Sequence, residues 1–341
     1  MSGEHPHKDL EERIVALEDQ AHTHLQPGPE LAKGSWVLQQ IDSMGQFNNL
    51  RGQIEAAVNQ PAALGFSVRA GWDRIETAPR VYDWSIFNEA HDLAQAAGKP
   101  LSVRFMGGRW TPDHVGGPTH QEDGETVPTP FNADSTVNQI WLDAYASMVD
   151  ELTLWAVNRG VSLVHYAWWG ALWAELHHGQ GVRKAPGYGA GWQVAWLPAH
   201  EALMQVVLDR IQGVPVFAEF PLTGRGPLTS GQSEALADYL STPQAVVQMN
   251  GWQPDKIAGG PNNQVENLWM DLATLIRDRG QLFALQDVGT SSEFGWANPT
   301  QPGEATQAYG LADTYQAAYT ELYLPRWTDP EILAAAAAWV N

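Results

Sequence analysis

The sequence predicts an α/β fold of eight parallel strands and intervening helices, the (β/α)8 or TIM barrel, preceded by a short N-terminal coiled-coil helix. One observation is an apolar run from Gly65 to Trp72, followed by apolar residues at helical spacing between Trp84 and Ala97, and by a second apolar run from Lys99. A connection of that length is typical of a parallel crossover, so we expect a parallel sheet covered on both faces. The other observation is the number of such apolar runs along the chain.

Eight apolar runs are interpreted as strands. They are 35–41, 65–72, the run from 99, 161–170, 213–221, 245–252, 281–289 and 318–325. Helical spacing of apolar residues separates the later runs, at 138–157, 199–211, 231–240, 265–278 and 305–317. Eight strands that alternate with helices favour a closed barrel over an open sheet.

Two long segments follow predicted strands. Residues 111–136 are rich in Pro, Gly, Thr and acidic residues, and residues 171–197 are rich in Gly, Trp and His. A barrel of this kind builds its site from the loops that follow its strands. We therefore expect both segments on the functional face.

The chain divides into a short N-terminal segment and one large domain. Residues 1–25 are predicted to be a coiled-coil oligomerisation segment, 26–34 a linker with Pro and Gly, and 35–341 the barrel. Asp9 and Glu12 fit a capping box at the start of the coil. Its apolar seam has the alternating spacing of heptads and consists of Leu10, Ile14, Leu17 and Ala21. Two heptads are marginal alone, so the coil would act where partner chains are already held together elsewhere.

Composition excludes several classes of function. A formal net charge of −20 and a pI near 4.8 argue against nucleic-acid and anionic-membrane partners, whereas neutral polymers fit. The 341 residues contain no cysteine, so disulfides and thiolate metal sites are ruled out. We find no apolar run long enough for a membrane span, no classical leader, no phosphate or dinucleotide loop, no Gly-x-Ser-x-Gly and no His-Glu-x-x-His.

The motif R-x-G-W-x-x-I-E, which begins at Arg69, is followed by Y-D-W-S and by A-x-x-x-G-K-P-L-S-V-R. This series resembles the second and third βα units of retaining glycoside hydrolases with a (β/α)8 barrel, the group that contains β-galactosidases and cellulases. The resemblance implies two carboxylates, one beyond strand four and one beyond strand seven. Hydrolysis with retention of configuration requires the two carboxyl groups to lie about 5–5.5 Å apart. One then acts as the acid and the other as the nucleophile.

Candidate catalytic residues follow from this resemblance. Glu175, set among tryptophans after strand four, is expected to be the acid/base, although Ala174 replaces the Asn that the family usually carries before it. Gln286 occupies the expected nucleophile position after strand seven, with Asp287 beside it. Either Asp287 has taken that role or the site has lost its nucleophile. Glu219 in strand five is a substitute candidate, with a structural role as its alternative.

Candidate sugar-binding residues lie at predicted strand ends. The 16 tryptophans of the chain are many for its length, and flat indole faces stack on sugar rings. For each tryptophan the alternative is packing in the core. We assign substrate contacts to Trp72, Arg104, Trp110, Trp168, Trp169, Trp173, Asn250, Trp252 and Gln286.

His22 and His24 directly follow the predicted coil. A short acidic coil that runs into Ala-His-Thr-His resembles the N-termini of bacteriophage minor tail proteins and tail fibres. That resemblance implies a homotrimer in which His22 and His24 of three chains surround one metal ion. The alternative is a pair of solvent-exposed histidines in a linker.

Two functions of different class follow. The first is a phage tail protein, located in the virion, whose barrel binds host cell-surface polysaccharide. Its partners would include other tail proteins. Whether the barrel also cleaves the glycan is left undecided by the sequence. The alternative is a free-standing, extracellular retaining glycoside hydrolase with Glu175 as acid/base. Gln286, which replaces the expected nucleophile after strand seven, favours glycan binding over hydrolysis. No cofactor is expected in the barrel itself.

Overall fold

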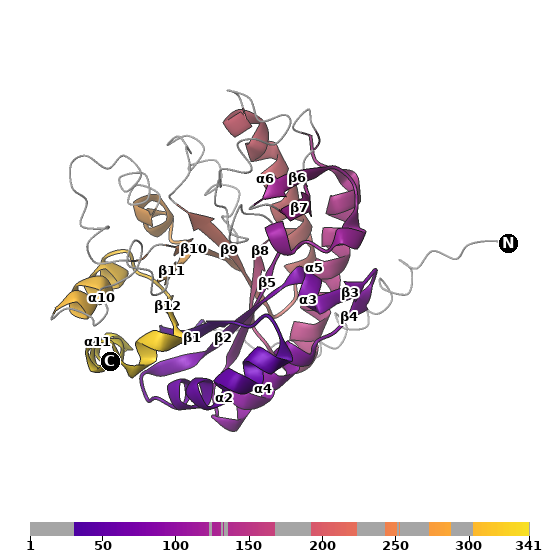
Figure 1. Ribbon diagram of the computed structural model, residues 1–341. Helices are drawn as coiled ribbons and strands as arrows, with labels where there is room; N and C mark the ends of the chain where they lie inside the picture. The colour runs from indigo at the N-terminus through magenta and orange to yellow at the C-terminus, as the bar shows by residue number, and fades with distance from the viewer. Residues whose placement is uncertain are drawn as a thin grey trace.

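Eight parallel strands form a closed barrel in the computed structural model, in the order β1-β12-β11-β10-β9-β8-β5-β2 (Figure 1). The structure describes residues 31–122, 125–130, 132, 136–167, 192–223, 243–250, 252, 273–287 and 303–340. The barrel strands are β1 (Gly34–Gln40), β2 (Ala63–Gly71), β5 (Leu101–Met106), β8 (Leu163–Ala167), β9 (Phe217–Thr223), β10 (Ala245–Asn250), β11 (Leu282–Gln286) and β12 (Tyr319–Tyr323).

Helices surround the barrel (Figure 1). They are α2 (Met44–Val58), α3 (Trp72–Ile75), α4 (Ser85–Ala96), α5 (Gln139–Arg159), α6 (Trp192–Ile211), α10 (Glu304–Thr314) and α11 (Pro330–Val340). Amphipathic faces explain their position; α4, for example, buries Phe87, Ala90 and Leu93. Among the described residues, no helix combines the length and apolar character needed to cross a membrane.

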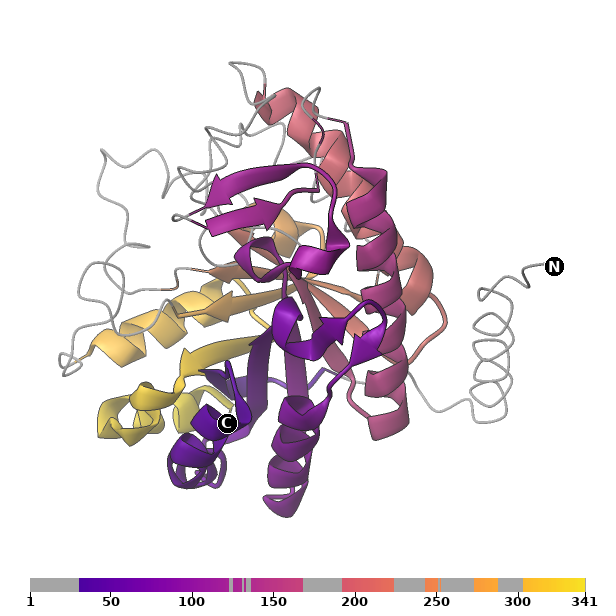
Figure 2. The ribbon, with the colours of Figure 1, turned by 45° about the vertical axis from the view of Figure 1, so that its right-hand side comes forward.

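Short hairpins and 3-10 turns follow the carboxyl ends of β2, β5 and β12. Hairpin β3 (Glu76–Ala78) and β4 (Val81–Tyr82) follows α3, and the segment after β5 contains the 3-10 turns η1 (Gly108–Trp110) and η2 (Asp113–Val115). A second hairpin, β6 (Thr119–Glu122) and β7 (Glu125–Pro128), contacts both turns (Figure 2). A last 3-10 turn, η4 (Leu324–Thr328), follows β12.

The predicted fold class is confirmed, since each of the eight predicted strands overlaps an observed one. The predicted helices 138–157, 199–211 and 305–317 overlap α5, α6 and α10, and residues 273–278 of the predicted helix 265–278 are helical. Helix α2 was not predicted, although Ser43 caps it by accepting a hydrogen bond from the backbone N–H of Gln46. The predicted coil, and the predicted helix 231–240, lie outside the described residues.

Side chains alternate along each strand between the helices and the barrel interior. One set, which includes Phe66, Val103 and Phe105, belongs to the large core that also contains helix residues. The other set fills the interior. Near the amino ends of the strands it forms an apolar layer, here termed the barrel floor: Trp36, Leu163, Val246, Ala284 and Tyr319.

Gly65 leaves room for the largest side chain of the barrel floor. A Cβ added to Gly65 would lie 2.5 Å from the carbonyl oxygen of Pro100 and 2.5 Å from a ring carbon of Trp36. Neither the backbone of Pro100 nor the buried indole can move without disturbing the barrel. The absence of a side chain at position 65 is therefore a packing requirement.

The variant Gly65→Ala should lose about 1–3 kcal/mol of unfolding free energy, because overpacking a filled core forces neighbours apart. Gly52→Ala is a matched control, since a Cβ at Gly52 in α2 meets no atom within 4 Å. It should gain about 1 kcal/mol from the higher helix propensity of Ala. Denaturant unfolding of both variants measures this, and equal stability of the two would contradict the packing argument.

Candidate functional site

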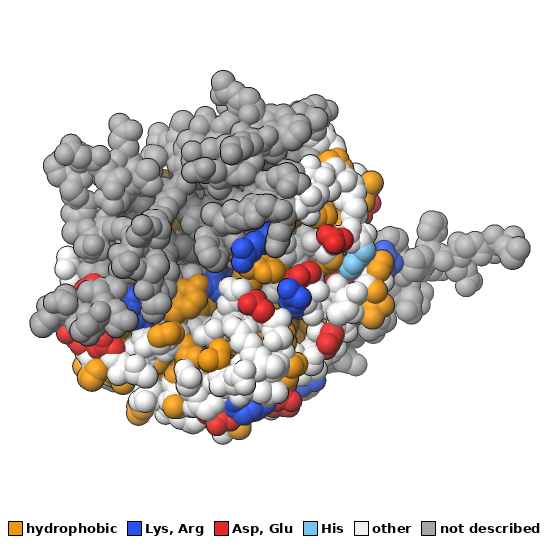
Figure 3. Space-filling view, viewed as in Figure 1, with side chains coloured by type: hydrophobic (Ala, Val, Ile, Leu, Met, Phe, Trp, Pro, Cys, Tyr) orange, Lys and Arg blue, Asp and Glu red, His pale blue; other side chains and the backbone are white. Residues whose placement is uncertain are grey.

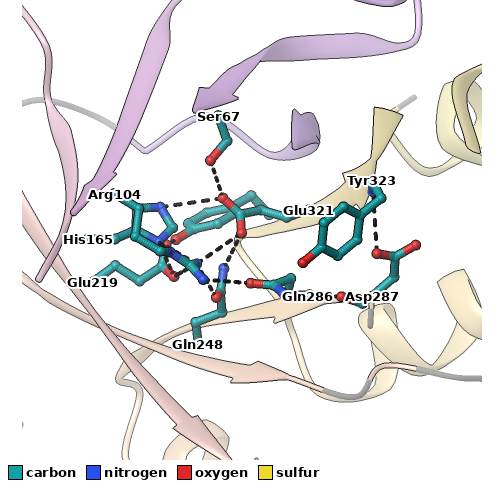
Figure 4. Close-up of polar contacts among 10 residues, drawn as sticks. Ser67, Arg104, His165, Glu219, Gln248, Gln286, Asp287, Glu321 and Tyr323 are labelled. Atoms are coloured by element: carbon teal, nitrogen blue, oxygen red, sulfur yellow. Dashed lines mark hydrogen bonds and ion pairs between the residues drawn. The ribbon is translucent and has the colours of Figure 1, made fainter. Parts of the chain in front are cut away.

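Above the barrel floor the interior is polar instead of apolar. Seven strands each supply one inward side chain, none more than 2% exposed. We call this group the interior polar cluster: Ser67, Arg104, His165, Glu219, Gln248, Gln286 and Glu321 (Figure 4). Interiors of such barrels are normally dominated by branched apolar side chains. A buried polar group that replaces them marks a candidate functional site.

Strand alternation explains how these residues meet. Most of them lie two residues beyond a member of the barrel floor, such as His165 after Leu163 and Glu321 after Tyr319. The strand register pairs Arg104 with His165, His165 with Glu219, and Gln286 with Glu321. Paired residues of parallel strands point to the same side of the sheet, so the whole group faces the barrel axis.

Arg104 is the centre of the cluster. Its Nη2 lies 3.1 Å from a carboxylate oxygen of Glu219 and 3.1 Å from one of Glu321. The guanidinium also donates to the side-chain oxygens of Gln286 at 2.8 Å and Gln248 at 2.5 Å. One cation thus bridges two carboxylates, and all three groups are fully buried.

Both carboxylates accept further hydrogen bonds. Glu321 accepts from the Ser67 hydroxyl at 2.5 Å and from the Gln248 amide at 2.8 Å. Glu219 accepts from the Tyr319 hydroxyl in the barrel floor. Buried charges are tolerated only when they are paired and hydrogen-bonded in this way.

His165 lies between the two carboxylates. Its Nδ1 is 2.6 Å from Glu219 and accepts from Arg104 Nε at 2.9 Å, and its Nε2 is 3.4 Å from Glu321. Burial, followed by the charges of Arg104 and Arg69, holds the pKa of His165 well below its usual value. We therefore expect a neutral imidazole, so that Arg104 is the cation that balances the two carboxylates.

His165, Glu219 and Glu321 also form a potential metal-binding group. Each offers one ligand atom, and these atoms lie within 4.8 Å of one another. One imidazole and two carboxylates suit several divalent metals. However, the Arg104 guanidinium already places a positive charge on both carboxylates. A metal ion would fit only if Arg104 moved away.

Gln286 and Asp287 separate at the end of β11. Gln286 points into the cluster and bonds to Arg104. Asp287, also buried, accepts a hydrogen bond from the backbone N–H of Tyr323 at 3.3 Å (Figure 4). It also lies 3.4 Å from Arg326 Nε. Asp287 is thus held by an ion pair beside β12, and Gln286 is the strand-seven residue that faces the axis.

The described tryptophans of the predicted sugar site are buried. Trp72 packs edge-to-face on Phe105 and Trp141 and donates to Glu76 at 2.7 Å. Trp252 donates to the Ala308 carbonyl at 3.0 Å. Both are 0% exposed, which agrees with the core-packing alternative for these two residues.

Trp110 lies in η1, the turn that follows β5, and is also buried, at 6% exposed. It packs with Met106, and the Arg109 guanidinium lies 4.3 Å from its ring centre. Asn250 ends β10 at the same face of the barrel. Glu175, Trp168, Trp169, Trp173, His22 and His24 lie outside the described residues.

Sequence reasoning missed four members of the cluster, which are Ser67, His165, Gln248 and Glu321. Each is a polar residue with mostly apolar neighbours in its strand, as in LVHYA and AVVQMN. That pattern is the signal that could have found them. A polar residue at an inward position of several parallel strands predicts a polar barrel interior.

Comparisons with known proteins give structural likeness alone. No protein-family model and no curated protein matches the sequence. The catalytic domain of β-amylase from Paenibacillus polymyxa superimposes with a TM-score of 0.58 at 8% identity, over 90% of this chain and 97% of that one. An endo-beta-1,4-glucanase from Xanthomonas axonopodis pv. citri superimposes with a TM-score of 0.54 at 10% identity, over 91% of this chain and 100% of that one. A D-allulose 3-epimerase from Methylomonas sp. superimposes with a TM-score of 0.50 at 9% identity, over 88% of this chain and 86% of that one. At these identities the likeness concerns the barrel fold.

Replacing Arg104 by Met should destabilise the protein by about 3–5 kcal/mol, because two buried carboxylates lose their shared counter-charge. The control Arg51→Met breaks a half-exposed pair with Glu89 and should cost about 1 kcal/mol or less. Denaturant unfolding at pH 7 measures both, and equal losses of unfolding free energy for the two variants would refute the assigned role of Arg104.

Proposed function

We propose that this protein is a carbohydrate-recognising barrel whose ligand binds at the carboxyl ends of the strands, above the interior polar cluster. The observation that carries the proposal is the cluster itself, in which hydrogen-bonding side chains from seven strands replace the apolar filling of a barrel. Sugar-binding sites combine such convergent polar groups with aromatic surfaces. At the rim, Trp110 lies in the turn η1 that follows β5, and the Arg69 guanidinium lies 4.7 Å from the ring centre of Tyr323.

The charge distribution supports a neutral polymer over a nucleic acid. On the face in Figure 3, the described acidic and basic side chains are interspersed with hydrophobic ones. The chain as a whole carries a net charge of −20. A polyphosphate would be repelled by this charge, whereas a neutral sugar would not.

Recognition is favoured over hydrolysis by the state of the barrel carboxylates. Glu219 and Glu321 are fully buried and share Arg104, and Asp287 is paired with Arg326. A retaining glycosidase needs an ionised nucleophile that can reach the sugar. The strand-seven residue that faces the axis is Gln286, an amide that cannot serve as that nucleophile. The second candidate function, a retaining glycoside hydrolase, therefore depends on Glu175.

The biological setting that we propose is a bacteriophage tail. In this proposal residues 9–24 join three chains, His22 and His24 hold a metal ion on the trimer axis, and three barrels present their sites to host cell-surface polysaccharide. Support comes from the heptad spacing of Leu10, Ile14 and Leu17 and from the His-x-His that follows. Trimerisation would strengthen binding to a repetitive polymer through avidity.

Purified cell-wall polysaccharides of candidate hosts should bind the full chain without release of reducing ends, and Glu175→Gln should behave in the same way. Release by wild type that disappears in the variant would establish the hydrolase instead. A chain trimmed to residues 26–341 should bind more weakly, because it has lost avidity. Failure of every neutral polysaccharide to bind would overturn the recognition proposal.

A further inference from the structure

A second polar site lies outside the interior polar cluster, where β2 and β5 end. Gly71 is the last residue of β2, and a Cβ added to it would lie 2.5 Å from Asp73 Oδ1 and 2.6 Å from Trp110 Cδ1. The missing side chain therefore lets a carboxyl group and an indole edge approach the strand end and each other. Gly71 has an ordinary backbone conformation (φ −66), so it is space and not backbone geometry that requires glycine here.

The Asp73 carboxyl is partly desolvated. Its side chain is 31% exposed and its Oδ1 is buried, and the backbone N–H groups of Asp73 and Arg74 interact with the carboxyl group. The other oxygen, Oδ2, lies 3.4 Å from Nε of the exposed Arg74. Burial raises the pKa of Asp73 above its ordinary value; Arg74 opposes this and the neighbouring Asp42 adds to it. A carboxyl group that is half withdrawn from water at the rim of a barrel is typical of a binding site.

Aromatic and cationic groups complete the site. The Arg109 guanidinium lies 4.3 Å from the ring centre of Trp110, and both residues belong to the turn that follows β5. Sugar rings are recognised by an indole together with carboxylate and guanidinium groups that bond to neighbouring hydroxyls. Asp73 and Arg109 supply the carboxylate and the guanidinium from the segments that follow the adjacent strands β2 and β5. The indole of Trp110, which is 6% exposed, supplies an apolar edge beside them.

We propose that Asp73, Trp110 and Arg109 form a subsite for a neutral sugar residue, in which the Asp73 carboxylate accepts hydrogen bonds from sugar hydroxyls. This inference rests on the proposed carbohydrate recognition and names the class of sugar. A uronic or sialic acid would place its carboxylate next to Asp73 and Asp42, on a protein of net charge −20, and the cations Arg74 and Arg109 offset only part of that repulsion. That repulsion selects against acidic sugars.

The subsite has a defined pH response. Hydroxyl donors bind the ionised carboxylate, so affinity is present above the pKa of Asp73 and is lost as pH falls through it. Because that pKa is raised, the loss begins at a higher pH than for an ordinary aspartate. An amide at this position has no such titration, so Asp73→Asn should remove this part of the pH dependence.

A glycan array with neutral and uronic-acid oligosaccharides, cellopentaose and maltopentaose among them, tests the subsite on the full chain. We expect binding confined to neutral glycans. For the best-bound neutral oligosaccharide, Asp73→Ala should weaken affinity by roughly tenfold or more, as expected when charge-assisted hydrogen bonds are removed. Asp73→Asn should lose less affinity and show a flatter pH profile. The control Asp92→Asn changes a side chain that is 69% exposed on α4 and should bind like wild type.

The outcomes separate the two proposals. Wild-type binding that is unchanged in Asp73→Ala, or binding of acidic glycans alone, would overturn the subsite and leave carbohydrate recognition standing. No binding to any glycan by wild type would overturn both. Thermal melting of each variant within a few degrees of wild type would show that a loss of affinity does not come from unfolding.

Discussion

The contact between the Arg104 guanidinium and the carboxylates of Glu219 and Glu321 governs the interior of this barrel. The three groups come from β5, β9 and β12, so they connect strands on different sides of the closed sheet. Two desolvated carboxylates could not remain charged there without a shared cation. The hydrogen bonds from Ser67, Gln248 and Tyr319 complete the arrangement, because they satisfy carboxylate oxygens that the guanidinium does not fully occupy.

This arrangement also limits the chemistry of the site. A carboxylate that is bridged by an internal arginine is not free to attack a sugar, and a metal ion has to compete with the guanidinium for the same oxygens. The interior polar cluster is therefore better suited to hold a fixed pattern of donors and acceptors below a ligand. The rim differs, because Asp73 and Arg109 keep partial contact with solvent beside Trp110. The rim and the interior polar cluster are therefore both consistent with a ligand that is recognised at the rim, above a rigid polar interior.

Much of the fold could be predicted from the sequence, because apolar periodicity and the spacing of strands and helices are local properties. Arg104, Glu219 and Gln286 could be picked out as polar residues of predicted strands. Their partnership could not, since Ser67 and Glu321 are 254 residues apart and meet only after the barrel closes. Likewise, Gln286 and Asp287 are neighbours in sequence, and the strand register decides which faces the axis. Trp72 and Trp252 show that composition alone does not separate core tryptophans from exposed ones.

The most direct test of this account is a mutant cycle that combines Arg104→Met with Glu219→Gln and Glu321→Gln, followed by denaturant unfolding at pH 7. If the guanidinium serves to neutralise these carboxylates, the triple variant should be more stable than Arg104→Met alone by about 2 kcal/mol or more, since neutral amides need no counter-charge. Destabilisation that is simply additive across the three substitutions would contradict the account, because it would show that the three side chains contribute independently.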